Sequence, residues 1–163
     1  MRVYHGSLER VPTPEIRMAT RTLDYGIGFY TTTSAKQAED WVRKRMKDAK
    51  ASKGYVNEYE LDLDKLPFFK CLLFDSPSDE WIDFVMNNRL NKDFVHDYDI
   101  VYGPVANDHV YTCFALYEGN LMSKQNLLTE LRTYDLVDQY LFHTAQALPL
   151  LTFIKAKEIL WEK

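Results

Sequence analysis

Hydrophobic and polar positions repeat with two different periods along the chain, which predicts a mixture of strands and helices. Residues 55–63 alternate with a period of two, which is typical of a half-buried strand. Tyr55, Tyr59, Leu61 and Leu63 would share its buried face. Further strands are predicted over residues 2–5, 29–33, 99–105, 137–143 and 152–161.

Helical spacing begins after Ser34, where Ala38, Trp41 and Val42 fall on one side of a helix. Gln37 follows Ser34 by three residues, which is the pattern of a capping box. Other helices are predicted after Ser78 and over residues 108–118 and 124–133. Because strands and helices do not alternate regularly, the pattern predicts an α+β fold.

Length and composition indicate a single domain spanning residues 1–163, since 163 residues with a hydrophobic fraction of 46% can bury a core of their own. No apolar run approaches the ~20 residues needed to cross a bilayer. The chain opens on a strand-like run rather than a signal peptide. We therefore expect a cytoplasmic protein with no membrane partner. Cys71 and Cys113 lie in apolar stretches without metal-ligand spacing, so no metal site is expected.

The net charge of −4 argues against a general nucleic-acid binder but leaves a local basic patch open. A run of cations lies at the end of the first predicted helix, comprising Arg43, Lys44, Arg45, Lys47, Lys50 and Lys53. Two interpretations remain for this run: a solvated helix face, or a binding surface for RNA or DNA.

Three short segments in a fixed order carry the candidate chemistry. The first is Tyr4-His5-Gly6-Ser7. Its imidazole can bond a ribose hydroxyl, and its glycine lets a ligand approach the backbone. The alternative is a strand-ending histidine that makes an ordinary hydrogen bond.

The second segment, Gly26-Ile27-Gly28-Phe29-Tyr30-Thr31, precedes the helix that begins after Ser34. The face of an aromatic ring such as that of Tyr30 attracts a cationic pyridinium by about 0.5–2 kcal/mol. In the third segment, which runs from Val137 to His143, Gln139 offers an uncharged hydrogen-bond acceptor. Asp138 should face the opposite side of the strand, so we do not expect its carboxylate to act at the position of Gln139.

Together these segments resemble the His, Tyr and Glu motifs of the ADP-ribosyltransferase superfamily, in the branch of the poly(ADP-ribose) polymerases and diphtheria toxin. The chain also resembles small bacterial toxin-type members of that branch. The resemblance implies a split, mostly antiparallel two-sheet core with flanking helices and with NAD in the cleft between the sheets. It implies His5, Tyr30 and Gln139 as the catalytic set, with Gln139 where the family has its Glu.

The resemblance also assigns binding roles. His5 would hold the adenine ribose, and Gly6 and Tyr30 would hold the nicotinamide. Ser7 and Gly28 belong to the same NAD-binding motifs. Trp41 is either a second aromatic wall or a core residue of an amphipathic helix, and both remain open.

Further candidates lie in loops. Arg21, together with Arg17, lies in the loop where the resemblance places the NAD phosphates, although loop arginines are commonly solvated. Asn107 and Asp108 are candidates for the acceptor side of the cleft, and a simple helix cap is the alternative for Asn107.

The function implied by the resemblance is mono-ADP-ribosyl transfer from NAD to a macromolecule (protein, RNA or DNA). The chain would be the toxin of a bacterial toxin–antitoxin or phage-defence module, with a small antitoxin protein as partner. Replacing Glu by Gln removes a charge worth about 4 kcal/mol at ~4 Å and an effective dielectric of ~20, or roughly a thousandfold in rate. An NAD glycohydrolase and an inactive NAD- or partner-binding module therefore remain as alternatives.

Overall fold

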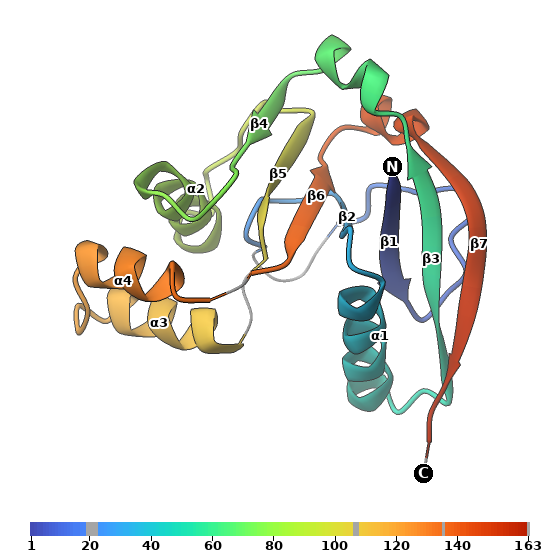
Figure 1. The fold of residues 1–163 in the computed structure, drawn as a ribbon, viewed down its shortest axis with the longest axis horizontal. Coiled ribbons are helices and arrows are strands. Elements are labelled where there is room, and N and C mark those ends of the chain that lie inside the picture. The colour runs from blue at the N-terminus through green and yellow to red at the C-terminus, as the bar shows by residue number, and fades with distance from the viewer. Residues whose placement is uncertain (19–22, 106–107, 135, 163) are drawn as a thin grey trace.

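The computed structural model describes residues 1–18, 23–105, 108–134 and 136–162 (Figure 1). Its strands are β1 (Arg2–Ser7), β2 (Phe29–Thr31), β3 (Lys53–Leu61), β4 (Cys71–Leu73), β5 (Ile100–Pro104), β6 (Asp138–Phe142) and β7 (Leu151–Leu160). Its α-helices are α1 (Ala35–Ala49), α2 (Asp79–Leu90), α3 (Asp108–Glu118) and α4 (Lys124–Leu131). Two 3₁₀ helices span Leu63–Phe68 and Ala145–Leu150.

The strands form two sheets, which confirms the predicted α+β class with a mostly antiparallel two-sheet core. The first sheet has the order β1-β3-β7 and is antiparallel. The second has the order β2-β6-β5-β4, and its β4–β5 pair is parallel. Tyr4 and Thr32 exchange backbone hydrogen bonds of 2.8 and 2.9 Å, and this bridge joins β1 to the end of β2.

A hydrophobic cluster fills the space between the two sheets. Val3 of β1 pairs with Tyr59 of β3, and Ile100 of β5 pairs with Phe142 of β6. All four side chains are fully buried. Because alternate residues of a strand point to opposite faces, their neighbours Val101 and Leu141 belong instead to a second cluster on the outer face of the second sheet.

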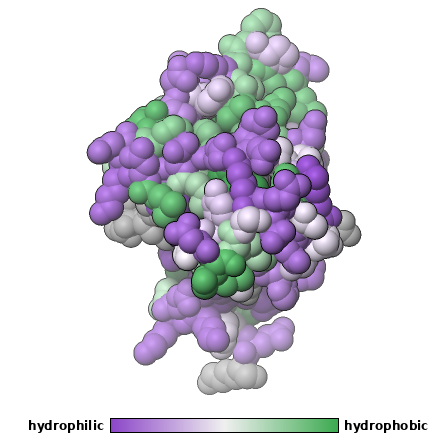
Figure 2. Space-filling view, turned by 90° about the vertical axis from the view of Figure 1, so that its left-hand side faces the viewer, coloured by the Kyte–Doolittle hydropathy of each residue, from purple (hydrophilic) through white to green (hydrophobic). Residues whose placement is uncertain are grey.

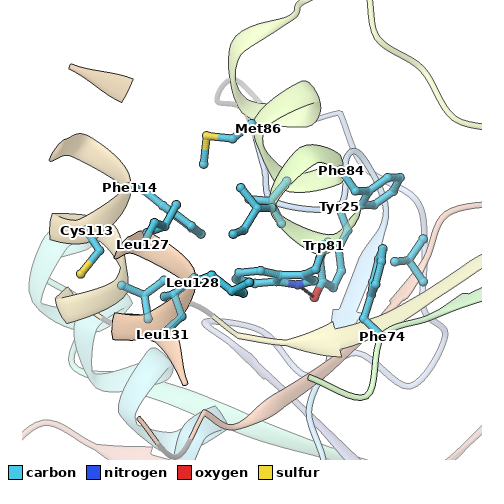
Figure 3. Packing of buried hydrophobic residues seen from close by; sticks show 14 of the residues in the cluster. Tyr25, Phe74, Trp81, Phe84, Met86, Cys113, Phe114, Leu127, Leu128 and Leu131 are labelled. Carbon is cyan, nitrogen blue, oxygen red and sulfur yellow. Dashed lines mark hydrogen bonds between the residues drawn. The ribbon is translucent and has the colours of Figure 1, made fainter. Parts of the chain in front are cut away.

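Helices α2, α3 and α4 cover that outer face (Figure 1). Trp81 of α2 is fully buried there, together with Phe114 of α3 and Leu127 of α4. Figure 3 shows these rings and branched side chains facing one another, with Tyr25 from the loop before β2 beside Trp81. The exterior of this helical layer is mainly hydrophilic, with separate hydrophobic patches (Figure 2).

Helix α1 packs on the first sheet, and Ser34 caps its start as predicted. The reciprocal bond of a capping box is replaced, because the Ser34 N–H donates to the Thr32 hydroxyl at 3.1 Å. The Ser34 hydroxyl accepts a hydrogen bond of 3.1 Å from the backbone N–H of Gln37, which satisfies a donor that the first turn leaves unpaired. Ala38, Val42 and Met46 form the buried stripe of α1. They pack against Val56 of β3 and Ile159 of β7.

The prediction for residues 55–63 was wrong at its end. Strand β3 ends at Leu61, because the backbone N–H of Asp62 bonds Leu150 and the chain then enters a 3₁₀ helix. Leu63 is consequently 43% exposed rather than buried. The strand expected over 29–33 likewise ends early, at Thr31, since Thr32 contributes only the bridge to Tyr4.

None of the helices that the structure describes is both long and apolar enough to span a bilayer.

Candidate active site

A pocket of about 850 Å³ lies where the two sheets meet α1. Its walls come from β1, β2, α1 and β6. The loop before β2, helices α2 and α3, and Val105 directly after β5 also contribute. Its volume is within the range typical of small-molecule sites. His5, Tyr30, Trp41 and Gln139 all line it. The fold therefore brings residues of all three sequence segments to one cavity.

His5 is held in a single tautomer. Its Nδ1 donates a hydrogen bond of 2.7 Å to the backbone carbonyl oxygen of Tyr30. A neutral imidazole has one donor and one acceptor, so Nε2 is left as the acceptor. Burial lowers the pKa of His5 from 6.5 to about 4, and the ring stacks on Phe29 at 4.1 Å between centroids. Near neutral pH, His5 therefore presents an uncharged acceptor suited to a hydroxyl.

Tyr30 lines the pocket, and its hydroxyl holds the loop before β2. The hydroxyl donates to the carbonyl oxygen of Gly26 at 2.5 Å and accepts from the backbone N–H of Tyr25 at 3.2 Å. Burial raises the pKa of Tyr30 well above its ordinary value. Gly26 has a φ of 87°, a conformation that glycine adopts without strain. These two hydrogen bonds of Tyr30 thus hold the loop before β2 against β2.

Two histidines also form hydrogen bonds with the same loop. His96 bonds the carbonyl oxygen of Tyr25 at 2.7 Å, and His143 bonds that of Ile27 at 2.5 Å. Their rings lie 4.1 Å apart between centroids. The position of the loop is therefore set by three side chains from three distant parts of the chain.

Gln139 is 8% exposed, and its side chain is bound to the protein framework. Its Nε2 donates to the carbonyl oxygen of Pro104 at 3.4 Å, the same carbonyl that the Tyr25 hydroxyl bonds. The Tyr25 hydroxyl in turn donates to Pro104 at 2.8 Å and accepts from Trp81 Nε1 at 2.7 Å (Figure 3). Since the amide nitrogen faces this network, Oε1 is the acceptor that Gln139 has left for a ligand.

Asp138 faces the opposite side of β6 from Gln139, as predicted. Its carboxylate accepts hydrogen bonds from the Thr33 hydroxyl at 2.7 Å and the Tyr102 hydroxyl at 3.1 Å. It does not line the pocket, so it brings no carboxylate to the site.

Trp41 belongs to the pocket rather than to the core. The buried stripe of α1 runs through Ala38, Val42 and Met46, whereas Trp41 is half-buried and lines the cavity. Lys44, one turn further along α1, places its Nζ 5.6 Å from the centroid of the Trp41 ring. Of the two interpretations that the sequence left open, the structure favours the aromatic wall.

The glycines of the motifs are packed tightly. A Cβ on Gly6 would lie 2.5 Å from the carbonyl oxygen of Ala38 and 2.9 Å from Val42. A Cβ on Gly28 would lie 2.4 Å from Leu141. Both glycines also line the pocket. Close contact between elements of the fold is therefore a sufficient reason for glycine at each position, beside any approach of a ligand.

Other predicted residues lie elsewhere. The Ser7 hydroxyl accepts from the backbone N–H of Glu9 at 3.1 Å, and Ser7 does not line the pocket. Arg17 pairs with Glu9 at 3.2 Å, and its side chain is 63% exposed. Arg21 and Asn107 lie outside the residues that the structure describes. Asp108 is the first residue of α3, and its side chain also lies outside them.

Sequence reasoning missed a charged group on the far wall. Arg89 of α2 lies 3.4 Å from Asp24 and 3.3 Å from Glu118, and its guanidinium lies 5.3 Å from the ring centroid of Tyr111. Arg89, Asp24 and Tyr111 line the pocket. An arginine in the last turn of a helix is common, so nothing in the local sequence distinguishes Arg89. Only the fold brings it to Asp24.

Comparison with known proteins identifies the family but no activity. A family model whose members are described as proteins of unknown function (DUF3990) matches residues 1–153. The chain belongs to the DUF3990 family. No curated protein and no solved structure matches this DUF3990 chain. Within the described ranges, no group of three or more His, Cys, Asp or Glu side chains is placed to hold a metal ion.

Proposed function

We propose that this DUF3990 protein is an NAD-dependent mono-ADP-ribosyltransferase. The supporting observation is the meeting of His5, Tyr30 and Gln139 at one pocket, although they come from β1, β2 and β6. In this proposal the two-sheet core is an ADP-ribosyltransferase fold, and the pocket receives NAD as substrate.

Four residues of the pocket are given roles in this proposal. His5 Nε2 accepts a hydrogen bond from a hydroxyl of the adenine ribose, because its Nδ1 is already committed to Tyr30. The rings of Tyr30 and Trp41 flank the nicotinamide and favour its positive charge. Gln139 Oε1 accepts from the 2′-hydroxyl of the nicotinamide ribose, since its amide nitrogen is turned toward Pro104.

The reaction breaks the bond between C1′ of that ribose and the nicotinamide nitrogen. Nicotinamide leaves with the electron pair and becomes neutral, and positive charge develops on the ribose. A nucleophile of the acceptor forms the new bond to C1′ and releases its proton to solvent. Gln139 supplies a dipole rather than a charge to this step, so we expect slow turnover unless the acceptor is itself a good nucleophile.

The biological setting follows from the motif resemblance. We propose a cytoplasmic toxin of a bacterial toxin–antitoxin or phage-defence module, held inactive by a small antitoxin protein. A second candidate is an NAD-binding module without turnover. The observation that favours it is Gln139 itself, which brings no carboxylate to the site and donates to Pro104.

Nicotinamide release from NAD by the purified protein, with and without cell lysate, tests the proposal. Release that requires lysate and is lost in Gln139→Ala and Trp41→Ala indicates a transferase. Release without lysate indicates an NAD glycohydrolase instead. Absence of release, together with an NAD-induced rise in melting temperature, would leave the non-catalytic module.

A matched control is Trp161→Ala, because Trp161 is 43% exposed and does not line the pocket. Trp41 is outside the buried stripe of α1, so its replacement should leave folding largely intact. Equal loss of nicotinamide release in the Trp41 and Trp161 variants would contradict the assigned pocket.

A further inference from the structure

The last turns of α1 and the turn into β3 form a concentrated basic segment, residues 44–53. Its cations are Lys44, Arg45, Lys47, Lys50 and Lys53, and its one carboxylate is Asp48. The segment therefore carries a net charge of +4 within a chain whose net charge is −4. All five cations are exposed. Such an asymmetry creates a local positive potential on an acidic protein.

Among the residues that the structure describes, the cations of the basic segment form no ion pairs. Earlier in α1, Lys36 pairs with Asp40 at 2.6 Å and Arg43 pairs with Glu39 at 2.8 Å. By contrast, none of the five cations of residues 44–53 lies within ion-pair distance of a carboxylate in the part of the chain that the structure describes. No ion pair therefore offsets their mutual repulsion, and an external polyanion would relieve it.

The basic segment is continuous with the pocket. Lys44 belongs to both, because it lines the cavity and its Nζ lies over the Trp41 ring at 5.6 Å. From Trp41 to Lys50 the helix rises about 14 Å at 1.5 Å per residue. In Figure 1, α1 extends away from the ends of β1 and β2. A chain-like ligand lying along α1 would therefore reach the pocket with one of its units.

We infer that the acceptor is a single-stranded nucleic acid whose phosphates lie along residues 44–53. A cationic track beside aromatic rings is the combination by which proteins bind single strands. Single strands also present a nucleotide to a pocket without the cost of leaving a duplex. This inference rests on the proposed function: a nucleophilic atom of the exposed nucleotide bonds C1′, its proton passes to solvent, and nicotinamide leaves with the electron pair.

Binding is tested without NAD, so that its outcome is independent of turnover. Fluorescence anisotropy is recorded with labelled strands of about 12 nucleotides, in RNA and DNA versions of one sequence, with their duplexes and with poly-glutamate as an acidic polypeptide. Sodium chloride is varied between about 50 and 200 mM. The test variant is Arg45→Gln/Lys47→Gln/Lys53→Gln, which leaves the pocket residue Lys44 unchanged.

The matched control is Arg10→Gln/Lys92→Gln/Arg132→Gln. These residues are also exposed, and their replacement removes the same charge from other parts of the surface. We expect the test variant to bind single strands about tenfold more weakly and to lower the salt slope by about 2, as three lost phosphate contacts predict. The control variant should retain its affinity within about twofold.

The inference would be overturned if the test and control variants lost the same affinity for single strands, or if the protein bound poly-glutamate more tightly than either strand. The RNA and DNA arms identify which strand supplies the phosphates. Transfer is then followed with labelled NAD and the preferred strand. Strand binding without any nicotinamide release would contradict the proposed function alone. The nucleic-acid acceptor would be contradicted, and the proposed function retained, by a different result. In that result nicotinamide release is unaffected in the test variant, and the label from NAD appears on protein.

Discussion

The imidazole of His5 and the backbone of Tyr30 are joined directly, with 2.7 Å between Nδ1 and the carbonyl oxygen. The two residues belong to different sheets, and the bridge between Tyr4 and Thr32 brings their strands together. One contact therefore sets the ring orientation of His5 and the position of Tyr30 at once. The first two sequence motifs form a preorganised unit before a ligand binds.

The first prediction concerns the protonation of His5. Its pKa is lowered to about 4 by burial, so between about pH 6.5 and 4 the unfolded chain binds a proton that the native state does not. His5 therefore lowers the stability of the fold as the pH falls through this window, and it has no such effect above it. NMR titration of the His5 Cε1 proton should show a midpoint near pH 4, against about 6.5 in denaturant. A native midpoint near 6.5 would contradict a His5 that is kept neutral by its surroundings.

A second prediction concerns the Tyr25 hydroxyl, which accepts a hydrogen bond from Trp81 Nε1 and donates one to the carbonyl oxygen of Pro104. Tyr25→Phe should lower the free energy of unfolding by about 1–3 kcal/mol, because it leaves the buried indole N–H without an acceptor. Urea denaturation measures this loss. Tyr55→Phe is the control, since that hydroxyl donates to Glu158 at the surface, and the effect of its removal should stay within about 0.5 kcal/mol.

Third, Gly6→Ala should destabilise the packing of α1 on the first sheet. The added methyl group would lie 2.5 Å from the carbonyl oxygen of Ala38, so the helix must shift at a cost of roughly 1–3 kcal/mol. Gly119→Ala is the control, because the nearest atom to its Cβ is 3.3 Å away and the expected change is below about 1 kcal/mol. Thermal unfolding followed by circular dichroism compares them, and equal melting temperatures would show that α1 yields readily at Gly6.

Fourth, Gln139→Glu tests whether charge limits turnover. A carboxylate facing the ribose should raise the rate of nicotinamide release by up to about a thousandfold. The same change should lower stability by about 1–3 kcal/mol, because a carboxylate cannot donate to Pro104 as Gln139 does. Gln125→Glu adds the same charge on α4, outside the pocket, and should change neither property. Absence of nicotinamide release in Gln139→Glu, with intact NAD binding, would favour the non-catalytic module.

Some residues of the pocket could be identified from the sequence and others could not. The sequence motifs identified His5, Tyr30 and Gln139, and the pocket contains all three. Arg89 was not identifiable, because its partner Asp24 lies 65 positions away and ordinary helix chemistry explains an arginine there. The orientation of Gln139 was equally hidden, since it depends on the carbonyl group of Pro104 in a neighbouring strand.

By itself the sequence determined the local elements. Ser34 and its spacing to Gln37 determined where α1 begins, and alternation indicated that Tyr59 and Leu61 share a buried face of β3, because caps and periodicity act within a few residues. Alternation did not indicate that Val56, on the opposite face of β3, is buried beneath α1. Only the tertiary structure decided that β3 ends at Leu61, that Gly6 lies beneath α1, and that Trp41 faces a cavity instead of the core. Each of these depends on which surfaces pack together, and packing joins residues whose separation along the chain leaves no local pattern to read.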